Sequence, residues 1–149
     1  MLYLSQRDPR WAQVFLSPSR LTIGRYGCTT TSICMISDYF GCYKAPDQVI
    51  GHEIQYNGEG LILWTTINFP CFKFSERIYG QNDDKIRDAL KDPNKAVILQ
   101  VNHGAHWVVA LSKTLFGNDY NILDPWTGKK SQAIKNYHNI SGAAVFIRK

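Results

Sequence analysis

Apolar side chains recur at helical spacing in the first third of the chain. Ile33, Ile36 and Phe40 lie three or four residues apart, and this spacing predicts a helix over residues 29–40. Gly41 follows as the residue that ends this helix. Weaker patterns predict two further helical segments, at residues 45–50 and 61–68.

Runs of apolar and β-branched residues of strand length dominate the second half of the chain. The expected strands are residues 72–78, 96–101, 106–111, 120–123 and 143–147. A polar segment between the first two of them predicts a helix over residues 82–91, with Asn82 or Asp83 as its N-cap and Lys91 near its end. Helices first and strands later indicate an α+β fold, in which an antiparallel β-sheet packs on helices.

The composition is that of one globular domain spanning residues 1–149. Hydrophobic residues make up 44% of the chain and charged residues 19%, which excludes a disordered or fibrous protein. No apolar run approaches the roughly 18–20 residues of a membrane span. The first ten residues also lack the apolar stretch of a signal peptide. We therefore expect a protein without a membrane span that is made in the cytoplasm and reaches any other compartment by another route.

The net charge of the chain is +5. A mild surplus of this kind suits an anionic partner such as a cell wall, a nucleic acid or a membrane surface, and by itself selects none of them.

Four cysteines are spread over the chain, at positions 28, 34, 42 and 71. None belongs to a Cys-x-x-Cys pair, so the close ligand spacing of a zinc site is missing and we expect no metal. An even count is compatible with a disulfide framework, but the chain is long for that class and shows no secretion signal. We therefore expect Cys34, Cys42 and Cys71 to be free, mostly buried thiols.

Cys28 differs from the other cysteines because it follows Gly27 and opens the first predicted helix. A thiol at a helix N-terminus faces unpaired backbone N–H groups and the positive end of the helix dipole, and both favour the thiolate. Cys28 is therefore a candidate nucleophile. The alternative on position alone is a buried cysteine beside a turn.

Three polar residues elsewhere in the chain are candidates for the rest of a catalytic site. His106 begins a predicted strand and Asp124 ends the next one, so the two side chains can meet on adjacent antiparallel strands. A carboxylate on Nδ1–H of the imidazole would fix the tautomer that a base for Cys28 needs. The Gln6 amide and the backbone N–H of Cys28 can both donate to an oxyanion. Taken singly, each residue has a structural alternative: a satisfied histidine, a turn aspartate or an exposed polar side chain.

Four short segments, in this order, resemble the sequence boxes of the C39-like cysteine peptidases. They are a Gln-x-x-x-x-Trp start, a Gly-Cys box, a His-Trp-Val box and an Asp-Pro-Trp-x-Gly box, at residues 3–11, 23–32, 105–109 and 120–128. Ala105 replaces the glycine that usually precedes the histidine. Gln6 and Cys28 are 22 residues apart, a wider gap than in leader peptidases attached to transporters, which favours the free-standing branch of the family.

The resemblance implies a papain-like fold and a role for each candidate residue. Cys28 would be the nucleophile, His106 the general base and acid, Asp124 the orienting residue and Gln6 the oxyanion donor. We also expect three residues to border the substrate, namely Gly27, Trp107 and Trp126. Apart from the resemblance, two interpretations of residues 42–70 stay open, a lid or wall over the cleft and a part of the core. No cofactor is implied, and we expect a monomer.

The leading functional expectation is a cysteine peptidase or amidase that hydrolyses peptide bonds, in peptidoglycan stem or cross-bridge peptides, as in a phage lysin. A peptide or peptidoglycan substrate is then the expected partner, and no nucleic acid is expected. Three alternatives remain open. They are a protease for one specific protein or peptide, a transglutaminase-like or other acyltransferase, and a binding module that keeps the fold without catalysis.

Overall fold

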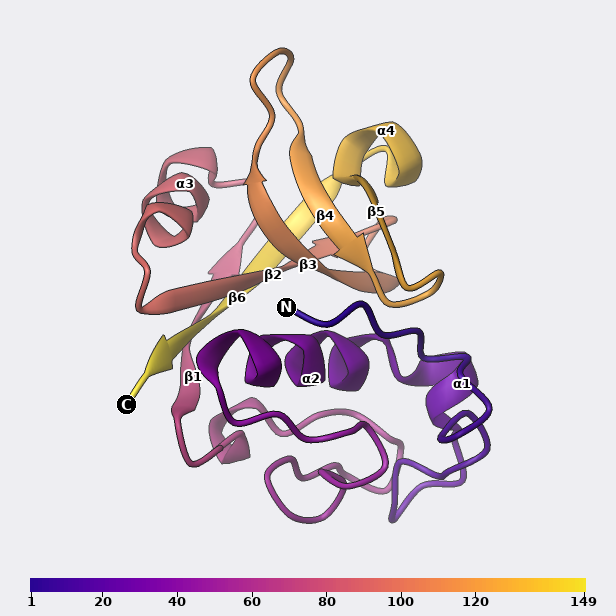
Figure 1. Cartoon of the computed structure of the whole chain (residues 1–149). Coiled ribbons are helices and arrows are strands. Elements are labelled where there is room, and N and C mark those ends of the chain that lie inside the picture. Colours follow the sequence, from indigo (N-terminus) through magenta and orange to yellow (C-terminus); the bar gives the residue numbers. More distant parts are fainter.

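The computed structural model describes all 149 residues and confirms the α+β class: one antiparallel sheet with helices on both faces (Figure 1). The helices are α1 (Ile23–Tyr26), α2 (Cys28–Phe40), the 3₁₀ turn η1 (Trp64–Thr66), α3 (Asp83–Lys91) and α4 (Ala133–Tyr137). The strands are β1 (Phe72–Tyr79), β2 (Lys95–Val101), β3 (His106–Lys113), β4 (Tyr120–Asp124), β5 (Lys129–Gln132) and β6 (Ile140–Arg148). The five expected strands and the helices at residues 29–40 and 82–91 are all present. No helix is long and apolar enough to cross a bilayer.

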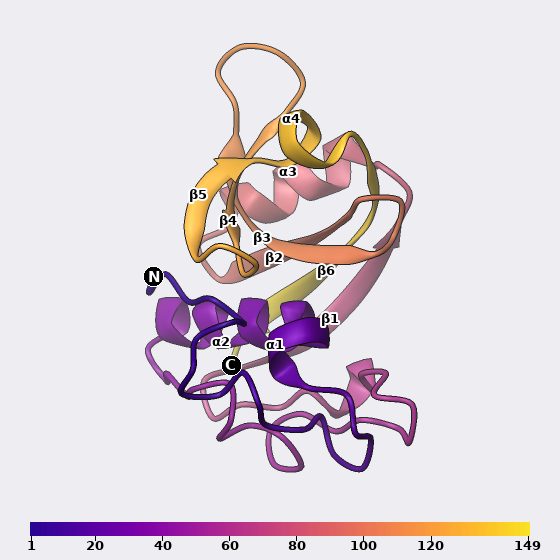
Figure 2. The ribbon, with the colours of Figure 1, turned by 90° about the vertical axis from the view of Figure 1, so that its right-hand side faces the viewer.

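The six strands lie in the order β1-β6-β2-β3-β4-β5, and all neighbours are antiparallel. Side chains of successive residues in a strand point to opposite faces, so the apolar strands supply two cores. Ile98 of β2 faces the core beneath α2, whereas Val97 and Leu99 face the core beneath α3 and α4. The sheet thus separates α2 on one face from α3 and α4 on the other (Figure 2).

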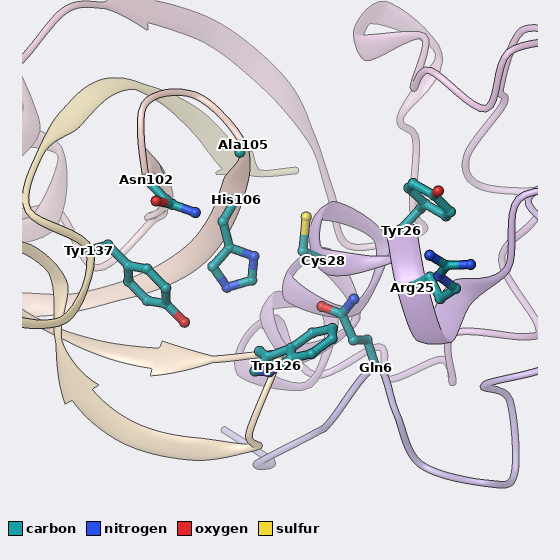
Figure 3. A pocket seen from close by; sticks show the side chains of 9 residues that line it. All are labelled: Gln6, Arg25, Tyr26, Cys28, Asn102, Ala105, His106, Trp126 and Tyr137. Atoms are coloured by element: carbon teal, nitrogen blue, oxygen red, sulfur yellow. The ribbon is translucent and has the colours of Figure 1, made fainter.

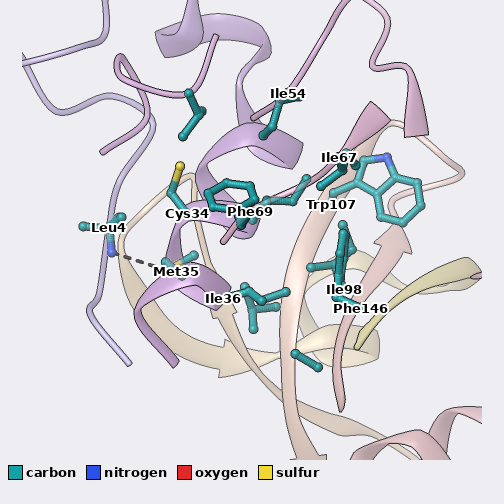
Figure 4. Close-up of a cluster of buried hydrophobic side chains, with 14 of the residues drawn as sticks. Leu4, Cys34, Met35, Ile36, Ile54, Ile67, Phe69, Ile98, Trp107 and Phe146 are labelled. Atoms are coloured by element: carbon teal, nitrogen blue, oxygen red, sulfur yellow. Dashed lines mark hydrogen bonds between the residues drawn. The ribbon is translucent and has the colours of Figure 1, made fainter. Parts of the chain in front are cut away.

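Helix α2 is buried along most of its length, from Thr30 to Ser37. The sheet covers one side of the helix and irregular chain covers the other, and apolar side chains fill the space toward the sheet (Figure 4). Gly41 ends the helix with φ +89°, and its N–H donates to the carbonyls of Ser37 and Asp38, as the sequence predicts. Tertiary packing therefore stabilises a helix whose three consecutive threonines are poor helix formers.

The chain between α2 and β1 is mostly irregular, and two predictions fail there. Residues 45–50 form turns, and within 61–68 only the 3₁₀ turn Trp64–Thr66 is helical. A short helix forms too few hydrogen bonds to offset the conformational entropy lost in forming its first turn. Here Ile54, Ile67 and Phe69 instead bury their side chains against α2 from an irregular backbone.

A disulfide joins the two ends of this irregular segment, between Cys42 and Cys71, whose Cα atoms are 6.1 Å apart. The prediction of free thiols is therefore wrong for these two cysteines. The sequence does not reveal the pairing because the 29-residue separation becomes short only after the segment has folded back over α2. Cys34 is free and fully buried, as expected, and Cys28 is also free.

Strand β5 and helix α4 were not predicted. β5 is a polar edge strand, so no apolar alternation marks it. α4 has five residues, and the Asp119 carboxylate accepts hydrogen bonds from the backbone N–H groups of Ile134 and Lys135, at 2.7 and 2.9 Å. Such a cap lies far from the helix in sequence and becomes recognisable only in the fold.

Candidate active site

Cys28 is the first residue of α2, and its thiol opens into a pocket of about 360 Å³. The pocket is lined by residues from five segments of the chain: Gln6, Arg25, Tyr26, Cys28, Asn102, Ala105, His106, Trp126 and Tyr137 (Figure 3). Because Cys28 is in the first turn of α2, its backbone N–H has no intrahelical acceptor and remains available to a ligand. The N-terminus of α2 thus supplies both a thiol and a hydrogen-bond donor to the pocket.

His106 and Asp124 meet across two neighbouring strands. His106 begins β3 and Asp124 ends β4, and His106 Nε2 lies 2.9 Å from Asp124 Oδ1. The contact predicted between these residues is present. The ring nitrogen involved was predicted wrongly, because the carboxylate binds Nε2 of His106 rather than Nδ1. Nδ1 is the ring nitrogen nearer the backbone, and it faces Cys28 on the opposite wall (Figure 3). The imidazole therefore bridges the thiol and the carboxylate.

Interactions among Cys28, His106 and Asp124 shift the pKa of each side chain toward its charged form. Burial raises the pKa of Cys28, but its hydrogen bond and charge interaction with His106 outweigh this effect and lower the pKa below its ordinary value. Burial lowers the pKa of His106, whereas hydrogen bonds with Asp124 and Cys28 raise it to about 9. Burial also raises the pKa of Asp124, yet its hydrogen bonds with His106 and Tyr137 bring it below the ordinary value. The three shifts all favour the charged forms, which are a thiolate, an imidazolium and a carboxylate.

Tyr137 is a site residue that the sequence did not reveal. Its hydroxyl donates to Asp124 Oδ2, and its ring centroid lies 5.0 Å from that of His106. The backbone N–H of Trp126 donates to Asp124 Oδ1 at 2.9 Å. Both oxygens of this buried carboxylate are therefore hydrogen-bonded, which fixes its position relative to the imidazole. Tyr137 lies in α4, and since that helix was not predicted, no pattern pointed to this residue.

Gln6 lies beside Cys28 and is only 1% exposed (Figure 3). Its backbone N–H donates to the Pro125 carbonyl at 2.7 Å, and its side-chain Nε2 donates to the Gly24 carbonyl at 3.2 Å. The amide oxygen is buried without a hydrogen-bond partner. An amide nitrogen carries two hydrogens, so the bond to Gly24 leaves one N–H of Gln6 unused, and the residue lines the pocket.

The three residues expected to border the substrate occupy different places. Trp126 lines the pocket and carries the Arg7 guanidinium over its ring, 4.4 Å from the ring centroid. Trp107 is 8% exposed and lines a neighbouring pocket instead. Gly27 is buried and lines neither pocket. A Cβ on Gly27 would lie 2.5 Å from the Ile23 carbonyl oxygen, so this glycine permits the close approach of α1 to α2.

The neighbouring pocket has a volume of about 420 Å³ and begins at residues next to Cys28 and His106 in the sequence. Tyr26 lines both pockets. Thr29, which follows Cys28, and Trp107, which follows His106, line the second. Its outer wall comes from the irregular segment after α2, through Tyr56, Leu61 and Trp64 among others. The two pockets therefore adjoin each other at Tyr26, near the N-terminus of α2.

Taken together, these groups can perform nucleophilic acyl chemistry. Cys28 can supply the nucleophile, His106 a proton donor, and the Cys28 N–H with Gln6 Nε2 two donors for an oxyanion. No cluster of three His, Cys, Asp or Glu side chains arranged to hold a metal ion is present. Comparisons of the chain with protein-family models, with curated proteins and with solved structures found no match.

Proposed function

We propose that this protein is a cysteine peptidase or amidase of papain-like design, which cleaves peptide bonds through Cys28, His106 and Asp124. One observation carries the proposal. A cysteine at a helix N-terminus faces an imidazole whose far nitrogen is 2.9 Å from a buried carboxylate. A structural histidine needs neither a thiol with a lowered pKa on one side nor a fully hydrogen-bonded carboxylate on the other.

The first half of the reaction forms an acyl-enzyme. The Cys28 thiolate attacks the carbonyl carbon of the substrate, and the negative charge that develops on the oxygen is stabilised by the Cys28 N–H and Gln6 Nε2. His106 then transfers its Nδ1 proton to the departing amine nitrogen as the C–N bond breaks. A thioester and a neutral imidazole remain.

The second half restores the enzyme. A water molecule attacks the thioester, and its proton passes to His106 Nδ1. The C–S bond then breaks, which releases the carboxylic acid and returns the thiolate–imidazolium pair. If an amine attacks instead of water, the same site performs acyl transfer, so the geometry supports both reactions and the acceptor decides between them.

Cationic side chains near the opening favour an anionic substrate surface. Arg25 lines the catalytic pocket, and Arg7 lies over Trp126 at its rim. Neither arginine forms an ion pair within the chain. Together with the net charge of +5, this supports peptidoglycan peptides as the substrate class that we propose.

The test combines thiol labelling with product analysis. Iodoacetamide should alkylate Cys28 and leave Cys34 unmodified, because Cys34 is fully buried. Mass spectrometry of tryptic peptides identifies the site, and Cys28→Ala is the matched control. Purified cell walls and unfolded polypeptides are then incubated separately with the protein and analysed for new amino termini. Absence of new termini on both substrates, with an unreactive Cys28, would contradict the proposal. Incorporation of an added amine without hydrolysis would identify an acyltransferase.

A further inference from the structure

The neighbouring pocket contains a cation that the catalytic steps do not use. Arg77 of β1 lies on its wall, together with Trp64, Gln100 and Trp107. The guanidinium carbon is 4.8 Å from the ring centroids of Trp64 and Trp107 and 5.3 Å from that of Tyr79. The guanidinium thus packs against aromatic rings, which restrict its position.

Little of the hydrogen-bonding capacity of Arg77 is used within the protein. An arginine carries five N–H donors, yet the one side-chain bond of Arg77 runs from Nη2 to Gln100 Oε1 at 3.4 Å. Its Nε atom is buried without a partner, and none of the ion pairs of the molecule includes it. By contrast, Arg10 and Arg87 are paired with Asp8 and Asp84. A partly buried cation with free donors favours a ligand that carries negative charge.

The pocket lies where a substrate side chain would enter. Tyr26 joins it to the catalytic pocket, and Thr29 and Trp107 directly follow the two catalytic residues Cys28 and His106 in sequence. In an extended peptide, residues advance about 3.3 Å each and their side chains alternate in direction. For a peptide with its scissile carbonyl at Cys28, we therefore expect a side chain one or two residues away to enter this adjoining pocket.

We propose that Arg77 is a specificity residue that binds the carboxylate of an acidic substrate side chain in this pocket, next to the bond that is cleaved. The aromatic rings of Trp64 and Trp107 would contact the apolar stem of that side chain, and the guanidinium would donate to its carboxylate. This inference rests on the proposed function, since it assumes that Cys28 is the reactive group. Glu59 lies on the exposed rim of the same pocket and opposes such a ligand.

Covalent probes test the proposal without knowledge of the natural substrate. The probes are acetyl-Xaa-Gly vinyl sulfones with Glu, Gln or Lys at Xaa, and intact mass gives the second-order rate of labelling of Cys28. We expect the Glu probe to react about tenfold faster than its isosteric Gln probe, and the Lys probe to react slowest. The Glu advantage should shrink as salt is raised, because the pocket is open to solvent.

Variants identify the group responsible. Arg77→Gln should reduce the Glu/Gln rate ratio to about one, whereas Glu59→Gln should increase the ratio. Arg148→Gln is the matched control, because Arg148 lies over Phe40 and lines neither pocket. Probes with D-Glu and D-Gln show whether the carboxylate comes from a cell-wall stem peptide or from an ordinary polypeptide. A faster reaction of either Glu isomer than of the corresponding Gln probe supports the proposal.

Three results would overturn the inference while Cys28 remains reactive. They are equal rates for Glu and Gln in the unaltered protein at low salt, a Glu preference that survives Arg77→Gln, or a Glu preference lost in Arg25→Gln instead. The first of these needs no variant, so misfolding of Arg77→Gln does not affect it. Failure of every probe and of iodoacetamide to label Cys28 would instead contradict the proposed function.

Discussion

The two halves of this molecule are stabilised in different ways, and the candidate site lies between them. The C-terminal half is a regular sheet with an apolar core on each face, and it carries His106 and Asp124. The N-terminal half consists of α2 surrounded by irregular chain, closed by the Cys42–Cys71 disulfide, and it carries Cys28. The proposed reactivity thus depends on a contact between the halves rather than on either half alone.

The sheet half holds its site residues in fixed positions, whereas the irregular half supplies a pocket wall that can vary. In the sheet half, backbone ladders fix the Asp124–His106 pair, and Tyr137 and the Trp126 N–H hold the carboxylate. In the other half, the outer wall of the neighbouring pocket comes from irregular chain, which tolerates sequence change more easily than a strand does. We infer that the contact between Cys28 and the fixed His106–Asp124 pair determines the chemistry, and that the irregular segment, together with Arg77 of β1, adjusts which substrates enter.

The largest expected effect comes from the nucleophile. Cys28→Ala should reduce turnover by at least about 10⁴-fold, because the covalent step has no substitute. Thermal unfolding should change little, since the thiol lies in a pocket and not in the core. Turnover is measured on the most active peptide, and circular dichroism reports the fold. Retained turnover in Cys28→Ala would show that Cys28 is not the nucleophile.

The carboxylate in the sheet half should have the next largest effect. Asp124→Asn should lower kcat/KM by about 10³–10⁴-fold, as loss of an orienting carboxylate does in other triads. In the unaltered protein, kcat/KM should fall above pH 9, because His106, whose pKa is raised to about 9, loses the proton that the leaving amine needs. It should also fall at low pH, where the Cys28 thiolate becomes protonated.

The pH profile of Asp124→Asn shows whether this carboxylate acts through His106. Asp124 favours the charged imidazole, so its loss should move the pKa of His106 down toward 6.5 and shift the alkaline limb to lower pH. Tyr137→Phe is the matched control, because it removes one hydrogen bond but keeps the carboxylate, and it should cost no more than about tenfold. An unchanged alkaline limb in Asp124→Asn would contradict the assignment.

Gln6 lies in the half that carries Cys28, and its replacement should have a smaller effect on turnover. Gln6→Ala should reduce kcat by about 10²–10³-fold, since it removes one of two oxyanion donors. Because the Gln6 main chain binds Pro125, the variant should keep its fold. The readout is kcat together with KM, and a change confined to KM would assign Gln6 to substrate binding instead.

The same division explains what the sequence could predict. The strands of the sheet half were recognisable because runs of strand length such as 96–101 are buried on both faces. The contact between His106 and Asp124 followed from their places at the ends of adjacent strands. In the other half, helical spacing revealed α2, but the irregular chain around it was not predictable, because Cys42 and Cys71 approach each other only through long-range packing. Tyr137 was missed for a related reason: α4 depends on a cap from Asp119, far away in sequence.

Removal of the disulfide should have the smallest effect on chemistry and a clear effect on stability. Replacing both Cys42 and Cys71 by Ala frees a 29-residue loop, and loop-closure entropy predicts a loss of about 3–4 kcal/mol in the free energy of unfolding. Labelling of Cys28 at 20 °C should stay within about twofold, because the thiol, His106 and Asp124 lie outside that loop. Chemical denaturation measures the first quantity and iodoacetamide kinetics the second. A large loss of Cys28 reactivity in the folded variant would show that the irregular segment also positions Cys28 against His106. The roles of the two halves could then not be separated.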